Sequence, residues 1–199
     1  ITYVGQTAPK YPEYVEQSYI CDLDNIENLK KLDLQREYDV VLLAENLEEI
    51  KSAQQLVSQA QAYLKPKGRM IVCLSNIALW FYRLSLMLGR LNYGPKGPLS
   101  KDHVHLYTRD TAIQMLSRSG LKINSVKPVN FPFEVLFESI GQSRFVKFLD
   151  RVYVIFAWVW PSLFAYQFVF EGSMTRYQSE QGEGMIEVKD NQSSKNREM

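Results

Sequence analysis

The chain has 199 residues and a formal net charge of +1, from 23 basic and 22 acidic side chains. This length suits one domain with a sizeable core, and 46% hydrophobic and 23% charged residues are ordinary for a globular protein. Binding of nucleic acid would need a strongly basic face, which the balanced charge does not support. We therefore expect no nucleic-acid partner.

The cysteines and the amino terminus indicate the cellular compartment of the protein. Cys21 and Cys73 fall in predicted buried strands, and no residues have metal-ligand spacing, so we expect reduced core thiols, a cytoplasmic protein and no metal. The amino terminus "ITYVGQ" lacks the basic and apolar regions of a signal peptide. Because the first residue is Ile, we expect either a processed chain or a fragment of a longer protein.

The first half of the chain alternates predicted strands and helices. Residues 1–5 and 18–23 are predicted as short buried strands joined by a proline-containing link, and 25–34 as a short helix. The stretch "YDVVLLAENLEEI" (38–50) begins with a continuous apolar run, which predicts a strand buried on both faces of a parallel sheet. Three acids follow on what the pattern predicts to be the first turn of a helix: Glu45, Glu48 and Glu49.

That helix is predicted over 47–64, because apolar residues recur there at spacings of three and four. Pro66 and Gly68 end it, and 69–75 is the next buried strand. After an excursion with an apolar helix and a Gly/Pro loop come a helix over 108–120 and a strand over 121–129. Thr108 or Asp110 would cap this helix at its start and Gly120 at its end.

A second apolar excursion runs to about Pro161, and 163–171 is predicted as the closing strand. We expect one domain over 1–172 and a polar tail over 173–199, disordered at least from Lys189. The alternation of strands and helices, ending in a hairpin-like pair of strands, predicts a doubly wound α/β domain. In such open sheets ligands bind at the carboxyl ends of the strands.

Five segments carry a family resemblance: "CDLD" (21–24), "YDVVLLAENLEEI" (38–50), "LKPKG" (64–68), Ser75-Asn76 and "GRLNYGPKGPLSKDHVHLYT" (89–108). In their order and spacing the chain resembles class I S-adenosylmethionine-dependent methyltransferases, in the branch that includes the MetW-like (methyltransferase type 11) enzymes. The resemblance covers residues 1 to about 130, and 163–171 resembles the family's last strand. It implies a Rossmann-like, mostly parallel sheet with an antiparallel last strand, apolar helical lid insertions, and S-adenosylmethionine as cofactor.

The resemblance also implies a cofactor site. Asp22 would accept the adenine amino group, and Leu23 would form an apolar wall for the ring. Gln6 stands where the family has the acid that binds the ribose. The backbone at three successive residues would lie beside the methionine part of the cofactor: Ala44, Glu45 and Asn46.

On the substrate side the candidates are Asn76, His103 and Tyr107. His103 is the catalytic candidate, as a base or an orienting group, since neutral imidazole can accept a proton near pH 7. A hydrogen-bonded structural histidine on a loop is an equally good interpretation. For His105 the structural interpretation is preferred, and Asn76 could equally be a turn residue.

The chain departs from the family in its amino-terminal part. Gly5 is the only glycine before Gly68, so the Gly-rich loop that lets the backbone approach the cofactor does not occur. One account is a domain without its first strand and helix, which would leave the family's second and fourth strands with unpaired edges. The other is a degenerate domain, a non-catalytic methyltransferase-like module that binds a partner. A nicotinamide-dependent reductase is a weaker alternative, since it also needs a Gly-rich turn.

Two aromatic-rich stretches suggest contact with lipid. The stretch 152–170 is uncharged and long enough for a membrane-spanning helix, but Pro161 interrupts it. "IALWFYRLSLML" (77–88) and "FVKFLDRVYVIFAWVW" (145–160) place basic residues at intervals among aromatic ones. We expect them to form a lid or to contact a membrane surface peripherally, with core packing as the alternative. The expected acceptor is a small molecule or a lipid-linked compound, and the sequence does not indicate the oligomeric state.

Overall fold

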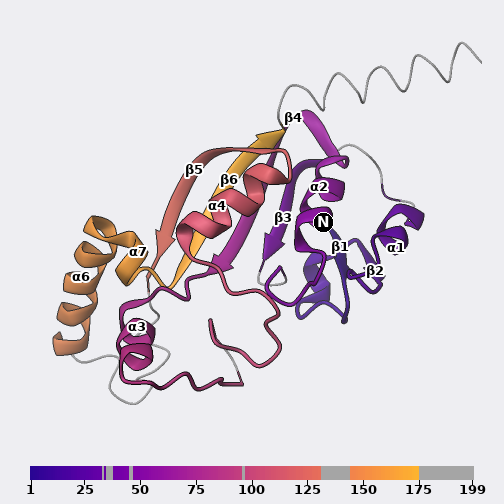
Figure 1. Cartoon of the computed structure of the whole chain (residues 1–199). Helices are drawn as coiled ribbons and strands as arrows, with labels where there is room; N and C mark the ends of the chain where they lie inside the picture. Colours follow the sequence, from indigo (N-terminus) through magenta and orange to yellow (C-terminus); the bar gives the residue numbers. More distant parts are fainter. Residues whose placement is uncertain (33, 35–37, 45–46, 96, 131–143, 175–199) are drawn as a thin grey trace, which may run out of the picture.

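The computed structural model describes residues 1–32, 34, 38–44, 47–95, 97–130 and 144–174. Its strands form two sheets (Figure 1). β1 (Thr2–Gly5) and β2 (Gln17–Ile20) pair in parallel as a two-stranded sheet. The four-stranded sheet has the order β3-β4-β6-β5 and is formed by β3 (Tyr38–Ala44), β4 (Leu64–Ser75), β5 (Leu121–Val129) and β6 (Gln167–Met174).

The larger sheet is parallel except for its last strand. β3 and β4 pair in parallel, whereas β6 lies antiparallel between β4 and β5. Ser75, at the carboxyl end of β4, is therefore opposite Gln167, at the start of β6. The predicted α/β fold with an antiparallel last strand is confirmed.

Helices α2 (Ala53–Gln61) and α4 (Arg109–Arg118) lie across the same face of the larger sheet in Figure 1. α4 begins with the predicted cap, because the Thr108 side chain accepts a hydrogen bond from the Thr111 amide in a capping box. It ends before Gly120, whose φ of 84° favours glycine. The short helices α1 (Ile26–Lys31) and η1 (Pro12–Tyr14) belong to the amino-terminal part.

The core lies between these helices and the sheet. Alternate residues of the central strands are fully buried there, as are the inward side chains of both helices, and each large one stabilises the fold by about 1.5–3 kcal/mol. The main members are Met70, Val72, Leu74, Phe168 and Phe170 from the strands, Leu56 and Val57 from α2, and Leu116 from α4.

The opposite face of β3 is open to solvent in the described part of the chain. Val40 is 43% and Leu42 is 59% exposed, whereas Val41 and Leu43 pack against the core. The prediction that this strand is buried on both faces was therefore wrong. An apolar run shows that both faces of a strand are able to be buried. Whether a second layer of the protein covers the outer face depends on tertiary structure.

β3 also has one unpaired edge among the described residues, since it pairs only with β4, and β1 pairs only with β2. An apolar cavity of about 370 Å³ lies between the two strands and is lined by residues of both, including Val4 of β1 and Leu42 of β3. Among the described residues, the two sheets thus present unpaired edges toward one cavity.

Several predicted boundaries need correction. α2 ends at Gln61 rather than at residue 64, and β4 begins at Leu64 rather than at residue 69, so Pro66 and Gly68 lie inside this strand and not in a turn before it.

Residues 47–49 form a turn and α2 begins only at Ala53, so Glu48 and Glu49 are not in its first turn. The closing strand begins at Gln167, because Pro161 starts the short helix α7 (Pro161–Phe164). β6 continues to Met174, two residues into the predicted tail, and the rest of that tail lies outside the described residues.

The cysteines are less buried than predicted. Cys21 follows β2 rather than lying in it, and both Cys21 and Cys73 are half-buried. Burial, together with the neighbouring Asp22, raises the pKa of the Cys21 thiol. Cys21 is therefore kept in its neutral form.

The two aromatic-rich stretches form helices α3 (Trp80–Met87) and α6 (Arg144–Val159). Figure 1 places them with α7 at the same end of the larger sheet. None of the helices in the described ranges is both long and apolar enough to cross a membrane.

Candidate functional site

Glu48 joins the carboxyl ends of β3 and β4. Its side chain is 1% exposed, and Oε1 accepts a 2.7 Å hydrogen bond from the backbone amide of Ser75. Its backbone carbonyl accepts from the amides of Val104 (2.7 Å) and His105 (2.9 Å). Glu48 therefore holds the loop before α4 against the end of the sheet. The sequence predicted that this acid lies on the first turn of a helix. The structure corrects that prediction, because Glu48 is buried in a turn before α2.

The second carboxylate oxygen of Glu48 is buried without a hydrogen-bond partner in the described chain. A buried unpaired carboxylate oxygen is costly, and such groups concentrate at functional sites. Its motif position was visible in the sequence, but its burial was not, because the loop that covers it is more than fifty residues away along the chain.

The predicted adenine-binding residues follow β2. Asp22 is exposed, and its Oδ1 accepts a 3.0 Å hydrogen bond from the Asp24 amide, while Leu23 is 6% exposed and belongs to the core. The Asp24 side chain accepts a 2.7 Å hydrogen bond from the Lys51 amide. This contact ties the loop after β2 to the loop after β3, so the ends of the two sheets are held together.

Leu23 and Ala44 line the apolar cavity between β1 and β3. Gln6 follows β1 and is exposed, outside that lining. Glu45 and Asn46 lie outside the described residues. The structure thus brings two of the predicted cofactor contacts, Leu23 and Ala44, to one cavity, whereas Asp22 precedes Leu23 in the chain and is not part of the lining.

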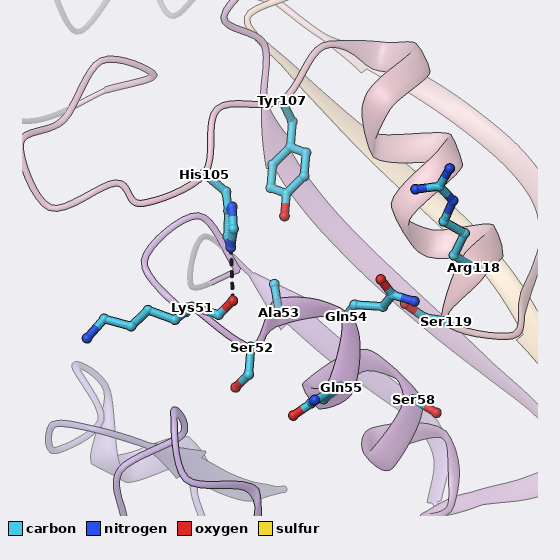
Figure 2. A pocket seen from close by; sticks show the side chains of 10 residues that line it. All are labelled: Lys51, Ser52, Ala53, Gln54, Gln55, Ser58, His105, Tyr107, Arg118 and Ser119. Carbon is cyan, nitrogen blue, oxygen red and sulfur yellow. Dashed lines mark hydrogen bonds between the residues drawn. The ribbon is translucent and has the colours of Figure 1, made fainter.

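A second cavity, of about 520 Å³, lies between α2, the end of α4 and the loop before α4 (Figure 2). Its lining is polar and includes Gln54, Ser58 and Arg118. Figure 2 shows the Tyr107 hydroxyl pointing toward α2 and the His105 ring hydrogen-bonded to the Lys51 carbonyl, at 3.1 Å. No residue lines both cavities.

Tyr107 lines this second cavity. It is 8% exposed, and burial, with a smaller effect of the Glu48 carboxylate, raises the pKa of Tyr107 to about 12. The phenol is therefore neutral throughout the physiological range.

The two histidines lie in different surroundings. His103 is half-buried on a loop, its Nδ1 lies 3.3 Å from the Pro98 carbonyl, and it lines neither cavity. His105, for which the structural role was preferred, is the histidine that lines the polar cavity.

Asn76 is fully buried and bonded to the backbone. Its Nδ2 donates to the carbonyls of Ala165 (2.8 Å) and Ser162 (3.2 Å), and its Oδ1 accepts from the Ala78 amide (3.0 Å). The amide fixes α7 against the end of β4. It is not presented to a substrate, which corrects the predicted contact.

A family model described as a methyltransferase domain matches residues 11–126, more than half of the chain. The chain belongs to the methyltransferase domain family. The predicted class I family, its Rossmann-like fold and its cofactor, S-adenosylmethionine, are thereby confirmed. No curated protein sequence matches the chain.

Solved structures of methyltransferases resemble this methyltransferase domain in fold. An S-adenosylmethionine-dependent methyltransferase from Archaeoglobus fulgidus is 13% identical with a TM-score of 0.51, over 85% of this chain and 74% of that one. A 1,6-didemethyltoxoflavin N1-methyltransferase from Burkholderia thailandensis, with its substrate and S-adenosylhomocysteine bound, is 12% identical with a TM-score of 0.50, over 87% and 60%.

A third structure, a possible histamine N-methyltransferase from Thermotoga maritima, is 11% identical with a TM-score of 0.47, over 80% of this chain and 64% of that one. The chain thus spans between 60% and 74% of the lengths of these three proteins.

Among the described residues, only part of the predicted cofactor site has chemistry suited to an adenine ring. An apolar cavity that Leu23 and Ala44 line suits a flat aromatic ring, and the exposed Asp22 carboxylate can accept from an amino group. For the methionine half, the described residues contain no equivalent of the Gly-rich loop, and the strand edges beside it are unpaired.

Proposed function

We propose that this methyltransferase domain transfers a methyl group from S-adenosylmethionine to a hydrophobic acceptor, either a small molecule or a lipid-linked compound. The main support is the apolar cavity that runs along β1 and β3, since Leu23 and Ala44 line its part at the carboxyl ends of β2 and β3. These are the ends at which open α/β sheets bind ligands.

The roles of the residues follow from their chemistry. Asp22 would accept a hydrogen bond from the adenine amino group, and Leu23 and Ala44 would exclude water from the ring. The bound cofactor supplies an activated methyl group, so the protein mainly has to orient the acceptor. The neutral Tyr107 hydroxyl can donate a hydrogen bond to an oxygen of the methyl acceptor. The Nε2 atom of His105 faces the Lys51 carbonyl. If Nε2 carries the ring proton, Nδ1 can accept a proton.

The acceptor class is inferred from the end of the sheet at which α3 and α6 lie. These helices expose large apolar side chains there, including Trp80 and Trp158. A hydrophobic acceptor would bury such side chains on binding, which is favourable.

Isothermal titration with S-adenosylhomocysteine tests the proposal. The titration uses the chain Ile1–Met199 and the same chain extended by any preceding coding sequence, because a strand paired with the open edges of β1 and β3 would complete the sheet. We expect Asp22→Ala to weaken binding by about 10- to 100-fold through loss of a hydrogen bond to a charged group.

The matched control is Asp39→Ala, which removes an exposed aspartate from the opposite end of β3 and should leave binding unchanged. If neither form of the chain binds S-adenosylhomocysteine, the cofactor assignment fails. The protein would then be a methyltransferase-like binding module.

A further inference from the structure

Two helices and the residues that follow them carry a group of strongly exposed large apolar side chains. Met87 is 84% exposed, Leu88 67%, Trp158 79%, Val159 64% and Trp160 60%. Isolated exposed apolar residues are common on proteins, but a contiguous group of this kind marks a surface that meets another apolar phase.

On each helix these side chains follow helical spacing and form one face. Along α3 the exposed side chains are spaced by four and then three residues, at Trp80, Leu84 and Met87. Along α6 they are spaced by three residues and then one, at Ile155, Trp158 and Val159. The opposite side of α6 packs inward, where Ala157 is fully buried. Both helices therefore expose an apolar face that the described residues leave uncovered.

The two faces belong to one surface. A side-chain hydrogen bond joins Trp80 of α3 to Tyr153 of α6, and the Tyr153 hydroxyl also donates to the Phe164 carbonyl of α7 at 2.6 Å. Figure 1 shows the three helices together at the end of the larger sheet. This is the end at which β4 finishes and the candidate site lies.

The charge around this surface is basic, although the chain as a whole is balanced. The parts of these segments whose side chains the structure describes, residues 78–95 and 151–164, contain three basic side chains and no acidic one, against 23 and 22 in the full chain. Arg83, Arg90 and Arg151 are exposed, and none of them forms an ion pair with a described residue. Basic residues among exposed tryptophans match the interface of an anionic bilayer, where indole rings lie at headgroup depth and arginines meet phosphates.

We propose that α3, α6 and the residues that follow each helix form a docking surface for a bilayer that contains anionic phospholipid. The helices would lie in the interface with Met87, Leu88, Trp158 and Trp160 inserted. Docking would place the carboxyl end of the sheet at the lipid surface. The inference does not depend on methyl transfer, and its assay contains no cofactor.

The chain provides its own probe, since its three tryptophans, Trp80, Trp158 and Trp160, all lie on this surface. We expect the protein to co-sediment with vesicles of phosphatidylcholine and phosphatidylglycerol. Its tryptophan emission should shift to shorter wavelength when it binds them. Brominated acyl chains should quench that emission. Vesicles of phosphatidylcholine alone should bind the protein more weakly.

The variant Met87→Ser/Trp158→Ser should weaken vesicle binding by about tenfold or more, because it removes two inserted apolar side chains. Arg83→Gln and Arg90→Gln should each weaken binding to anionic vesicles by about fivefold. The matched control is Tyr14→Ser/Ile20→Ser. These residues are 69% and 62% exposed but lie on η1 and β2.

Three results would overturn the proposal. One is no sedimentation with anionic vesicles, and another is equal binding by the two double variants. The third is a dimer in analytical ultracentrifugation that Met87→Ser/Trp158→Ser dissociates while vesicles fail to bind, since a second copy of the chain would then cover the surface.

Discussion

The carboxylate of Glu48 accepts a 2.7 Å hydrogen bond from the backbone amide of Ser75, and both groups are buried. This contact fixes the turn after β3 to the end of β4. The Glu48 carbonyl, which accepts from Val104 and His105, extends the connection to the loop that places Tyr107 at the polar cavity. One acid thus positions three segments of the candidate site.

Replacing Glu48 should therefore destabilise the domain. Glu48→Ala leaves the Ser75 amide buried without an acceptor, which should cost about 1–3 kcal/mol in the free energy of unfolding, whereas Glu48→Gln keeps an acceptor and should cost less. Urea denaturation measures both. Glu49→Gln, at an exposed neighbour, should change the free energy by less than about 0.5 kcal/mol. An unchanged midpoint for Glu48→Ala would show that the hydrogen bond does not contribute.

The high pKa of Tyr107 gives a pH dependence with a definite sign. In the unfolded chain the phenol titrates near pH 10, and in the folded domain near about 12. Between these values the unfolded chain releases its proton first, so stability falls as pH rises. The stability difference between the natural chain and Tyr107→Phe should be constant below about pH 9 and fall from about pH 10 to 12.

Glu48→Gln gives a second test of that pKa. It should lower the pKa of Tyr107, because it removes the neighbouring charge, but burial should keep the value above the ordinary one. Tyrosinate absorbance follows the titration. The signal of Tyr107 is the difference between each chain, with or without Glu48→Gln, and the same chain carrying Tyr107→Phe. A Tyr107 that titrates at the ordinary value in the folded domain would contradict its burial.

Asn76→Ala should destabilise the protein by about 2–3 kcal/mol, since three hydrogen bonds to buried backbone groups lose their partner. Thermal and urea unfolding measure the change. Asn124→Ala provides the comparison, because that exposed amide donates only to the Ser173 hydroxyl, and it should cost less than about 0.5 kcal/mol. Equal costs for the two substitutions would contradict the structural role of Asn76.

Leu42→Ala tests the open face of β3. Leu42 is 59% exposed, so its truncation in the chain Ile1–Met199 should cost less than about 0.5 kcal/mol, whereas Leu74→Ala, at a fully buried residue of β4, should cost about 2–5 kcal/mol. Denaturant titrations of the two variants compare them directly. A large cost for Leu42→Ala would mean that another part of the protein covers this face.

The sequence by itself determined the order and type of the main elements. The apolar runs of β3 and β4, the Thr108 cap and Gly120 stop of α4, and the spacing of apolar residues in α2 are local signals, because hydrophobic period and capping chemistry act within a few residues. The motif order from Asp22 to Tyr107 also predicted the family.

Tertiary structure alone decided how exposed those residues are. Glu48 is buried because a loop more than fifty residues away covers it, Asn76 is bonded because α7 returns to the end of β4, and Leu42 is exposed because no described layer covers its face. The His105 ring lies at the polar cavity with its Nε2 hydrogen-bonded to the Lys51 carbonyl, 54 residues away along the chain. Such contacts join segments far apart in the chain, so no local pattern encodes them.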